Sequence, residues 1–346
     1  MPPKAAGPLT TSCSTSCSAT SSWLPFYSSC TGAGPTASRA RRATSAFTPR
    51  WQPACKRLGK PCSWAASTVC TRSEFRPLDP CKEQSPVIQF GICNPLTNHE
   101  LAAAGGCDYL ECGVSELLPL IPEDDHPDVE ARMAEFAATA LPVKAFAGFI
   151  PANLKVTGPE VEWGRLSAYL DTALRRASQV GADIVVWGSG HSRHVPDGFA
   201  RDAAEEQVVR FLHLAGHWAE QHGVTIAIEP LNTKESNIVN SVSEGVNFAE
   251  RVAHPRIRVL ADFYHMQEED EPTDVISRFG SWLSHMHTAD TGRLYAGSGD
   301  YPYADFVTEV NKADYQGMLS VECRWGEDLA GEIKASVDYL KSLWAT

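Results

Sequence analysis

Val224-Thr-Ile-Ala-Ile-Glu229 is a short, mostly apolar run of the sequence that ends on a carboxylate. Its apolar residues fall on both alternating faces, a pattern typical of a strand buried on both sides in a parallel sheet. The preceding His222-Gly223 places a glycine where an amphipathic stretch ends, as at the end of a helix. The stretch therefore predicts a helix end, followed by a buried parallel strand that carries Glu229 at its carboxyl end.

The same alternation of short apolar runs and longer amphipathic stretches continues through the chain from Val87 onward. The eight predicted strands are Val87–Ile92, Asp108–Cys112, Val143–Ala147, Asp183–Trp187, Val224–Glu229, Ile257–Asp262, Leu283–Thr288 and Gly317–Glu322. The clearest predicted helices between them are Gly164–Val180, Arg201–His222, Ser241–Val252 and Leu329–Leu343. Eight such units within residues 85–346 fit the roughly 250 residues of a (β/α)8 barrel.

A doubly wound α/β sheet is the competing fold class. It usually carries a glycine-rich phosphate loop after its first strand, whereas Cys93-Asn-Pro-Leu-Thr97 follows the first predicted strand here. Gly188-Ser-Gly190, after the fourth strand, is only a fragment of such a loop. We therefore predict an α/β protein in which residues 85–346 form a (β/α)8 TIM barrel.

Residues 1–84 differ in composition from the rest of the chain. They contain eleven Lys and Arg against three Asp and Glu, a net charge of +8, and seven of the 11 cysteines. Residues 85–346 contain 19 basic and 39 acidic residues, a net charge of −20. No sustained apolar period runs through this low-complexity Ser-, Ala-, Pro- and Cys-rich segment, so we expect a disordered basic extension. Organellar targeting and a small functional module are the alternatives, and no secretory signal is recognisable.

The overall charge and hydropathy exclude several function classes. A formal net charge of −12 opposes general nucleic-acid binding, which needs a basic surface. No run approaches about 18 consecutive apolar residues, so no membrane span is predicted. We expect a cytoplasmic protein that acts on a small molecule and has no nucleic-acid or membrane partner. The sequence does not decide whether the protein forms homo-oligomers.

Four successive predicted strands carry a polar residue at or next to their carboxyl end: Glu229, Asp262, His287 and Glu322. Barrel enzymes carry their chemistry at the carboxyl ends of the strands, so these side chains should share one rim. Grouped carboxylates repel each other unless a cation neutralises them. The four residues therefore predict a metal site, with a bare acidic cleft as the alternative. Three carboxylates and one imidazole suit Mn²⁺, Mg²⁺ or Co²⁺, and Mn²⁺ is the expected ion.

Short motifs in this half of the chain resemble a known family. They are Glu229-Pro-Leu-Asn-Thr-Lys-Glu235, Asp262-Phe-Tyr-His265-Met266, His285-Met-His287-Thr-Ala-Asp290-Thr-Gly-Arg293 and Val321-Glu322. With these motifs, residues 85–346 resemble the xylose isomerase-like TIM barrels, the sugar phosphate isomerase/epimerase superfamily, and most closely its ketose 3-epimerases of the tagatose/psicose type. The resemblance implies a function in carbohydrate metabolism and metal ligands at Glu229, Asp262, His287 and Glu322. It also implies substrate contacts at Glu235, His265 and Arg293.

The chain departs from the ketose 3-epimerases at two places. Glu322-Cys-Arg324 stands where they usually carry Glu-Pro-Phe, and the loop Gly188-Ser-Gly-His191-Ser-Arg193 has no counterpart in them. We interpret the polar side chains of this loop, Arg193 included, as ordinary loop residues. Trp187, which ends the fourth predicted strand, is predicted to stack on a sugar face, with a place in the barrel core as the alternative.

The chemistry predicted for such a site is proton transfer next to a carbonyl. A divalent metal would polarise the carbonyl and stabilise an enediolate, and a carboxylate, Glu229 or Glu322, would take the proton as the catalytic base. Return of a proton to the opposite face gives a sugar epimerase, and a shuttle between adjacent carbons gives an aldose–ketose isomerase. Loss of a leaving group would give a lyase or deglycosidase on 3-keto glycosides. A non-catalytic sugar-binding barrel and an apurinic endonuclease-like nuclease are remoter alternatives.

Overall fold

The computed structural model describes residues 88–117 and 128–345. The extension predicted to be disordered over residues 1–84 lies outside the described residues, as does the first residue of the first predicted strand. All the other predicted strands and helices fall within the described part of the chain.

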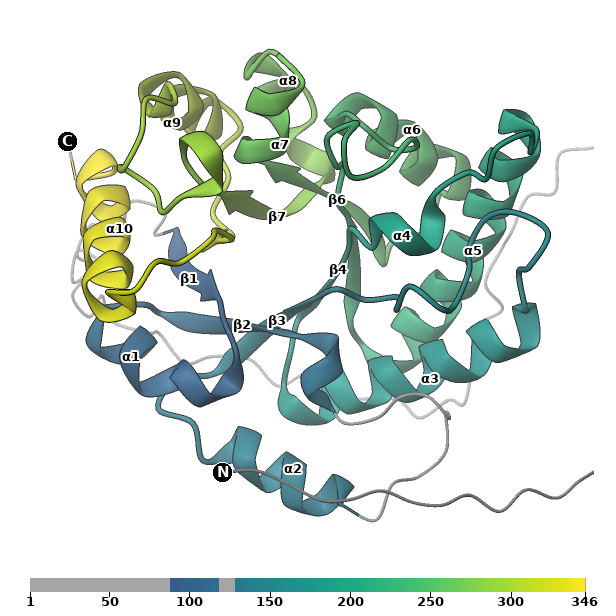
Figure 1. The fold of residues 1–346 in the computed structure, drawn as a ribbon, viewed down its shortest axis with the longest axis horizontal. Helices are drawn as coiled ribbons and strands as arrows, with labels where there is room; N and C mark the ends of the chain where they lie inside the picture. The colour runs from purple at the N-terminus through teal and green to yellow at the C-terminus, as the bar shows by residue number, and fades with distance from the viewer. Residues whose placement is uncertain (1–87, 118–127, 346) are drawn as a thin grey trace, which may run out of the picture. The chain divides into compact units, whose positions relative to one another are not determined.

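Eight parallel strands of the described chain close into a barrel in sequence order (Figure 1), so the predicted TIM barrel is confirmed. The pairing of β1 with both β2 and β8 closes the sheet. Three strands have the predicted bounds, and the others differ by one or two residues at one or both ends. The strands are β1 (Gln89–Cys93), β2 (Tyr109–Gly113), β3 (Val143–Ala147), β4 (Ile184–Trp187), β5 (Thr225–Ile228), β6 (Ile257–Asp262), β7 (Leu283–Thr288) and β8 (Met318–Val321).

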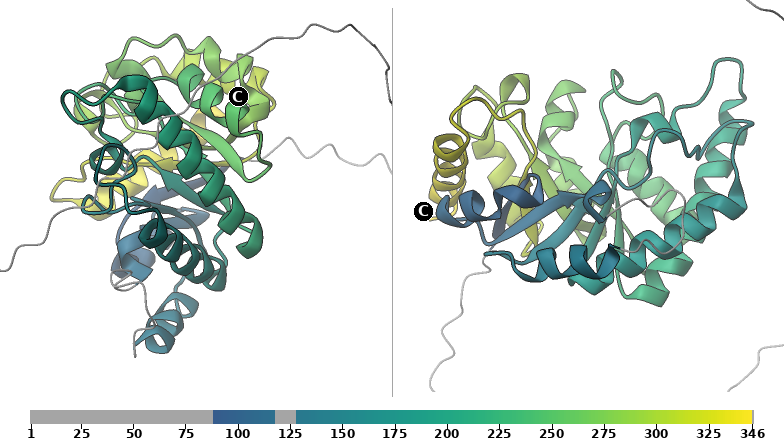
Figure 2. Two further views of the ribbon diagram at one scale, coloured as in Figure 1. Left: turned by 90° about the vertical axis from the view of Figure 1, so that its right-hand side faces the viewer. Right: turned by 60° about the horizontal axis from the view of Figure 1, so that its bottom comes forward.

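Helices enclose the barrel, as Figures 1 and 2 show. The four clearest predicted helices all form, and the left-handed glycines Gly181 and Gly223 end the first two of them. The helices are α1 (His99–Ala104), α2 (Val129–Ala137), α3 (Trp163–Val180), α4 (Gly190–Arg193), α5 (Arg201–His222), α6 (Val242–Val252), α7 (Phe263–Glu268), α8 (Asp274–Arg278), α9 (Tyr303–Lys312) and α10 (Leu329–Leu343). Short 3-10 turns lie at Leu96–Asn98, Val114–Leu117, Gly280–Trp282 and Thr291–Arg293.

Side chains alternate along each strand between the barrel interior and the surrounding helix layer. In β4, Ile184 and Val186 belong to the small apolar cluster inside the barrel, whereas Val185 and Trp187 belong to the large cluster under the helices. In β5, Ala227 points inward and Ile228 outward. The next residue, Glu229, therefore points inward again, and the same parity decides which residues can reach the site.

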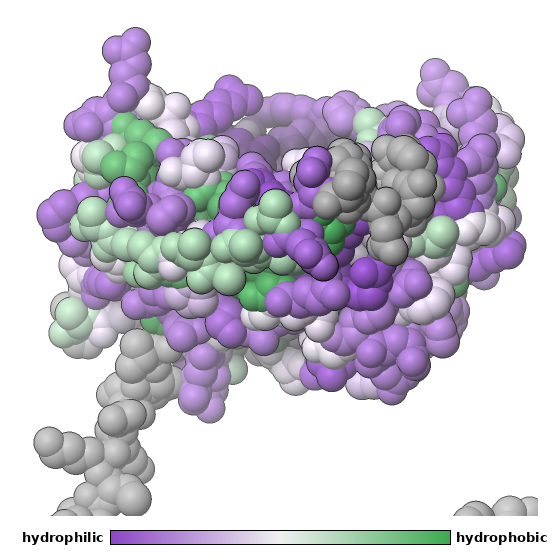
Figure 3. All heavy atoms as spheres, turned by 90° about the horizontal axis from the view of Figure 1, so that it is seen from below, coloured by the Kyte–Doolittle hydropathy of each residue, from purple (hydrophilic) through white to green (hydrophobic). Residues whose placement is uncertain are grey.

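The helices around the barrel are amphipathic and turn their polar sides outward. The face seen in Figure 3 is mainly hydrophilic, with hydrophobic residues interspersed, and Leu101 and Leu294 are the exposed large hydrophobic side chains of the described residues. Within residues 88–117 and 128–345, no helix is both long enough and apolar enough to cross a membrane.

Candidate functional site

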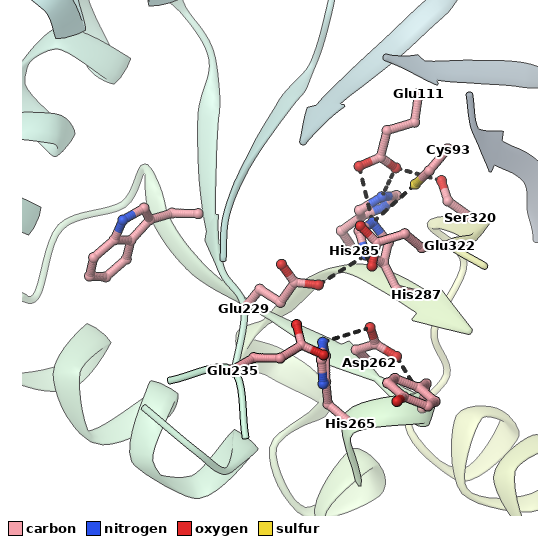
Figure 4. Close-up of polar contacts among 12 residues, drawn as sticks. Cys93, Glu111, Glu229, Glu235, Asp262, His265, His285, His287, Ser320 and Glu322 are labelled. Atoms are coloured by element: carbon pink, nitrogen blue, oxygen red, sulfur yellow. Dashed lines mark hydrogen bonds and ion pairs between the residues drawn. The ribbon is translucent and has the colours of Figure 1, made fainter. Parts of the chain in front are cut away.

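Four side chains from successive strands meet at the carboxyl end of the barrel (Figure 4). We call Glu229, Asp262, His287 and Glu322 the rim cluster. Glu229 and Glu322 directly follow β5 and β8, and Asp262 and His287 lie in the last two positions of β6 and β7. One ligand atom of each lies within 4.8 Å of the others. The expectation that these four residues share one rim is therefore correct.

The rim cluster is almost entirely shielded from solvent. Asp262 and Glu229 are buried, His287 is fully buried, and the Glu322 side chain alone is a quarter exposed. Nδ1 of His287 lies 3.1 Å from Oε1 of Glu229 and 3.8 Å from Oε2 of Glu322. Three carboxylates and one imidazole thus share a small space of low dielectric constant, where their charges interact strongly.

The two glutamates of the rim cluster differ in their affinity for a proton. Burial raises the pKa of Glu229, and the neighbouring Glu322 carboxylate raises it further. Burial also acts to raise the pKa of Glu322, but the charges of His287 and Arg293 outweigh it and lower this pKa. Two carboxylates whose environments move their pKa values apart are suited to opposite acid and base roles.

The donor atoms of the rim cluster fit a hard divalent cation. Asp262 Oδ1 accepts from the Tyr264 amide at 2.8 Å, while the buried Oδ2 has no hydrogen-bond partner among the described residues. A buried carboxylate oxygen without a partner is costly, and a cation beside it would remove that cost. Carboxylate oxygens with one imidazole nitrogen are ligands that Mn²⁺, Mg²⁺ and Co²⁺ accept.

Glu235, His265 and Arg293 lie beside the rim cluster. Arg293 donates one hydrogen bond from Nη1 to Oε1 of Glu235 at 2.9 Å and another from Nη2 to Oε2 of Glu322 at 2.6 Å. Nδ1 of His265 accepts from the Asn232 amide at 3.1 Å, which leaves the proton on Nε2. That buried Nε2 has no hydrogen-bond partner and lies 3.6 Å from Asp262 Oδ2. Since both His265 and Asp262 thus keep an unused polar atom, this corner of the site is suited to a polar ligand.

Arg293 has an uncommon backbone conformation. Its φ of 61° lies in the left-handed region, directly after Gly292 with a φ of 74°. Such a conformation is uncommon for a residue with a side chain and often marks a functional site. It directs the guanidinium toward the two glutamates, where the charge of Arg293 has a partner on each side.

The structure does not bring Trp187 into this site, which corrects the predicted sugar stacking. The indole is fully buried and lies 4.7 Å from the Phe211 ring of α5, in the layer between strands and helices. The reason is that side chains alternate along a strand. Val186 points into the barrel, so the next residue, Trp187, points outward to the helices. The alternative interpretation, a core position, is the one that the packing supports.

Arg193 is not the ordinary loop residue that the sequence suggested. It is fully buried, and its guanidinium donates to the backbone carbonyls of Glu229 at 2.7 Å and Trp187 at 3.0 Å. It also lies 5.1 Å over the Trp187 ring. Burial lowers the pKa of Arg193 to about 10, against the opposing effect of Glu229. This buried cation holds the backbone from which the Glu229 side chain projects.

A second buried group, missed from the sequence, lies deeper in the barrel. Glu111 of β2 is fully buried, and its carboxylate lies 3.0 Å from Nε2 of His287 and 2.8 Å from Nε2 of His285. Burial opposes ionisation of Glu111, but the charges of His287 and His285 outweigh it and lower its pKa well below the usual range. A carboxylate inside an otherwise apolar run was the signal in the sequence.

A cavity of about 780 Å³ has Glu235 in its lining but none of the four residues of the rim cluster. The loops after β3, β4 and β5 line it with Lys155, Thr157, His191, His194, Lys234 and Glu235. Glu235 also contacts Arg293, so the cavity borders the candidate site. Cavities of about 300–1,000 Å³ are typical of small-molecule sites.

Comparison with known proteins gives a family match and similar folds. Residues 99–343 match the family model described as "Xylose isomerase-like TIM barrel". The D-psicose 3-epimerase of Ruminiclostridium cellulolyticum is 26% identical over 245 residues, 68% of this chain and 80% of that protein. Three further curated relatives match over between 42% and 56% of their own length.

Two solved structures have the same fold as the described barrel. The 3-keto-D-glucoside 4-epimerase of E. coli superposes with a TM-score of 0.63 at 23% identity, over 74% of this chain and all of that one. The D-psicose 3-epimerase of Clostridium cellulolyticum H10, solved with D-tagatose, gives a TM-score of 0.64 at 20% identity, over 74% of this chain and 99% of that one.

Proposed function

Since the chain belongs to the xylose isomerase-like TIM barrel family, we propose that it is a divalent-metal-dependent epimerase or isomerase of a ketose or related keto-sugar. The family match agrees with the resemblance drawn from the sequence motifs. The observation that carries the proposal is the rim cluster, in which four ligand atoms from four successive strands lie within 4.8 Å of one another. The names of curated relatives, D-psicose 3-epimerase first among them, support the sugar substrate.

Glu229, Asp262, His287 and Glu322 would hold the ion, with Mn²⁺ the ion we expect and Mg²⁺ or Co²⁺ as alternatives. The ion, when bound, supplies Lewis-acid polarisation of a carbonyl and the neighbouring hydroxyl. The partnerless Asp262 Oδ2 and the mixed oxygen and nitrogen donor set support this assignment.

The two glutamates are the proposed proton carriers. β5 and β8 are separated by β6 and β7 in the sheet, and this separation supports the proposal that Glu229 and Glu322 reach opposite faces of the reacting carbon. One carboxylate takes the proton next to the carbonyl to give the enediolate, and the other returns a proton to the opposite face. This is an epimerisation, and we place it ahead of the aldose–ketose shuttle because two separate carboxylates are available as proton carriers and curated relatives are named 3-epimerases.

The neighbouring residues would orient the sugar. The Nε2–H of His265 is free to donate to a substrate hydroxyl, and the forked Arg293 can bind a substrate oxygen while it holds Glu235. Glu235 is a hydrogen-bond acceptor at the border of the cavity. These three residues leave no need for the buried Trp187 in the substrate site.

The proposal is tested by incubating the metal-replete protein with a panel of ketoses and resolving the products by chromatography. We expect an epimer or isomer of at least one ketose, loss of conversion after chelation, and its return with Mn²⁺. Glu322→Gln should lower kcat by about 10²–10⁴-fold, whereas Asp338→Asn, which breaks an exposed ion pair with Lys334, should leave kcat unchanged. Equal activity of Glu322→Gln and the wild type would refute the assignment.

A keto-glycoside substrate is the second candidate, and the cavity beside Glu235 favours it. The lining contains two lysines and two glutamates with two histidines, a balanced set that suits a neutral, hydroxyl-rich group better than an anion. A second sugar ring attached to the reacting keto-sugar would occupy this space, either for epimerisation or for elimination of an aglycone. Higher kcat/KM for 3-keto glycosides than for every free ketose, with or without a released aglycone, would decide for this candidate.

A further inference from the structure

We propose that Glu111 is a positioning residue, which fixes the ring orientation and the protonated nitrogen of His287 and thereby sets the affinity of the rim cluster for a divalent ion. The inference rests on the proposed function in one respect, since it takes His287 as a ligand. It adds a residue from the other side of the barrel, on β2, that none of the strand-end motifs includes.

The two nitrogens of His287 face different neighbours (Figure 4). Nδ1 faces the rim cluster, 3.1 Å from Glu229 and 3.8 Å from Glu322. Nε2 faces the barrel interior and lies 3.0 Å from Oε1 of Glu111. A carboxylate can only accept, so Nε2 carries a proton and donates it to Glu111. Nδ1 is then the nitrogen whose lone pair is available to a cation among the rim carboxylates.

Glu111 is itself held firmly in place. Its second oxygen, Oε2, accepts from Ser320 Oγ at 2.6 Å and lies 2.8 Å from Nε2 of His285. Ser320 Oγ in turn lies 2.7 Å from the Tyr109 hydroxyl. The partners of the carboxylate come from β7 and β8 while Glu111 comes from β2. Because Glu111 is also fully buried, neither water nor a rotation of its side chain can easily replace these contacts.

Cys93 raises a competing interpretation. Its Sγ lies 3.9 Å from Nε2 of His287, and the ligand atoms of Cys93, Glu111 and His287 lie within 4.8 Å of one another. A second ion at this position would need the lone pair of Nε2, which the hydrogen bond to Glu111 excludes. Both oxygens of Glu111 are also already engaged. The geometry therefore favours a hydrogen-bonded support for one ion over a second ion.

The test measures the affinity for Mn²⁺ alone, by titration calorimetry, in the full-length protein. In Glu111→Leu, the leucine is similar in volume to the glutamate but cannot accept the hydrogen bond from His287. We expect Mn²⁺ binding to weaken about 10- to 100-fold, the usual effect of losing the hydrogen-bond partner of a metal-binding histidine. Glu111→Gln keeps an oxygen that can accept from Nε2, so its loss should be smaller. Glu309→Leu removes another largely buried glutamate, in α9, and should bind Mn²⁺ like the wild type.

The wild type supplies a second readout, the position of the proton on the His287 ring. With the protein saturated with diamagnetic Mg²⁺, ¹⁵N spectra of labelled histidine should show His287 protonated on Nε2, assigned by its absence in His287→Gln. Protonation on Nδ1 would overturn the inference. So would unchanged Mn²⁺ affinity in Glu111→Leu, or a second tight ion lost in both Glu111→Leu and Cys93→Ser. A wild type that binds no divalent ion would instead refute the proposed function.

Discussion

Arg293 connects the substrate side of the proposed site with the metal side. Its guanidinium binds Glu235 with one nitrogen and Glu322 with another. A planar, forked cation can hold two carboxylates at once, whereas an ammonium group has no such fixed geometry. Arg293 therefore keeps Glu322 ionised and in place, and at the same time positions Glu235 at the border of the cavity.

For this reason we expect Arg293→Lys to weaken substrate binding more than metal binding. Loss of one charge-assisted hydrogen bond costs about 1.5–3 kcal/mol, so KM should rise at least about tenfold. The Mn²⁺ dissociation constant should change less than KM, because lysine keeps the positive charge beside Glu322. Steady-state kinetics and Mn²⁺ titration measure the two effects. Arg278→Lys, in an exposed pair with Asp274, is the matched control. A variant with wild-type KM would show that Arg293 does not contact the substrate.

At the residue scale, the sequence predicted those site residues that end a strand. Glu229, Asp262 and His287 stand at or near the boundary between an apolar run and a loop, and a barrel brings such boundaries together. Glu111 lies inside its strand, and its partner His287 is 176 positions away in the chain. Such a pairing depends on which face of the strand a residue occupies and on which strands the closed barrel brings together. Residues at strand ends alone do not reveal it.

At the scale of elements, the strands and the long helices were predictable and the short helices were not. A strand buried on both sides gives a continuous apolar run, and an 18-residue helix such as α3 shows several turns of its amphipathic pattern. In contrast, α4 has four residues and α7 six, too few for a period to be recognised. Yet α7 carries His265, and α4 carries Arg193 behind Glu229.

The end of β4 approaches the rim cluster closely at Gly188. A Cβ placed on Gly188 would lie 2.1 Å from Oε2 of Glu229, so Gly188→Ala must displace that carboxylate. Because the displaced group is the end of a flexible side chain, we expect little change in the unfolding temperature. We expect a fall in kcat/KM of about 10²-fold, as for other small misplacements of a catalytic group. Thermal unfolding and kinetics measure both.

Gly164→Ala is the control for this substitution, since no atom lies within 4 Å of its added Cβ in α3. Alanine there should slightly stabilise the helix and leave kcat/KM unchanged. Full activity in Gly188→Ala would mean that the position of Glu229 matters less than we propose.

The contact of β4 with α5 gives a separate prediction for Trp187. Trp187→Phe shortens a fully buried side chain against Phe211 and weakens its contact with Arg193. We expect a loss of about 1–3 kcal/mol in the free energy of unfolding, measured by urea denaturation, and a KM within twofold of the wild type. A large rise in KM without a loss of stability would restore the sugar-stacking role.

At the scale of the whole molecule, the barrel closes within the described chain. All eight strands and the rim cluster lie between Gln89 and Glu322, and the unit that contains them starts at Pro77. The contrast of a +8 segment before residue 85 and a −20 segment after it was visible in the composition. Composition does not reveal what the first segment does, because no apolar period or motif runs through it.

We therefore expect a chain that starts at Pro77 to retain Mn²⁺ affinity and kcat/KM within about twofold of the full-length protein, since every strand pairing is preserved. Circular dichroism, calorimetric titration and kinetics on the two proteins make the comparison. A truncated barrel that folds but binds Mn²⁺ much more weakly would show that residues before Pro77 contribute to the site.

Proton exchange with solvent is the direct test of the proposed enediolate mechanism. The metal-replete protein, with a ketose substrate in deuterium oxide, should place solvent deuterium on the carbon next to the carbonyl, in the product and then in recovered substrate, because Glu229 and Glu322 exchange protons through an enediolate. Mass spectrometry and proton NMR locate the label. Product formed without deuterium, or no exchange across a broad panel of ketoses and keto-glycosides, would contradict the account.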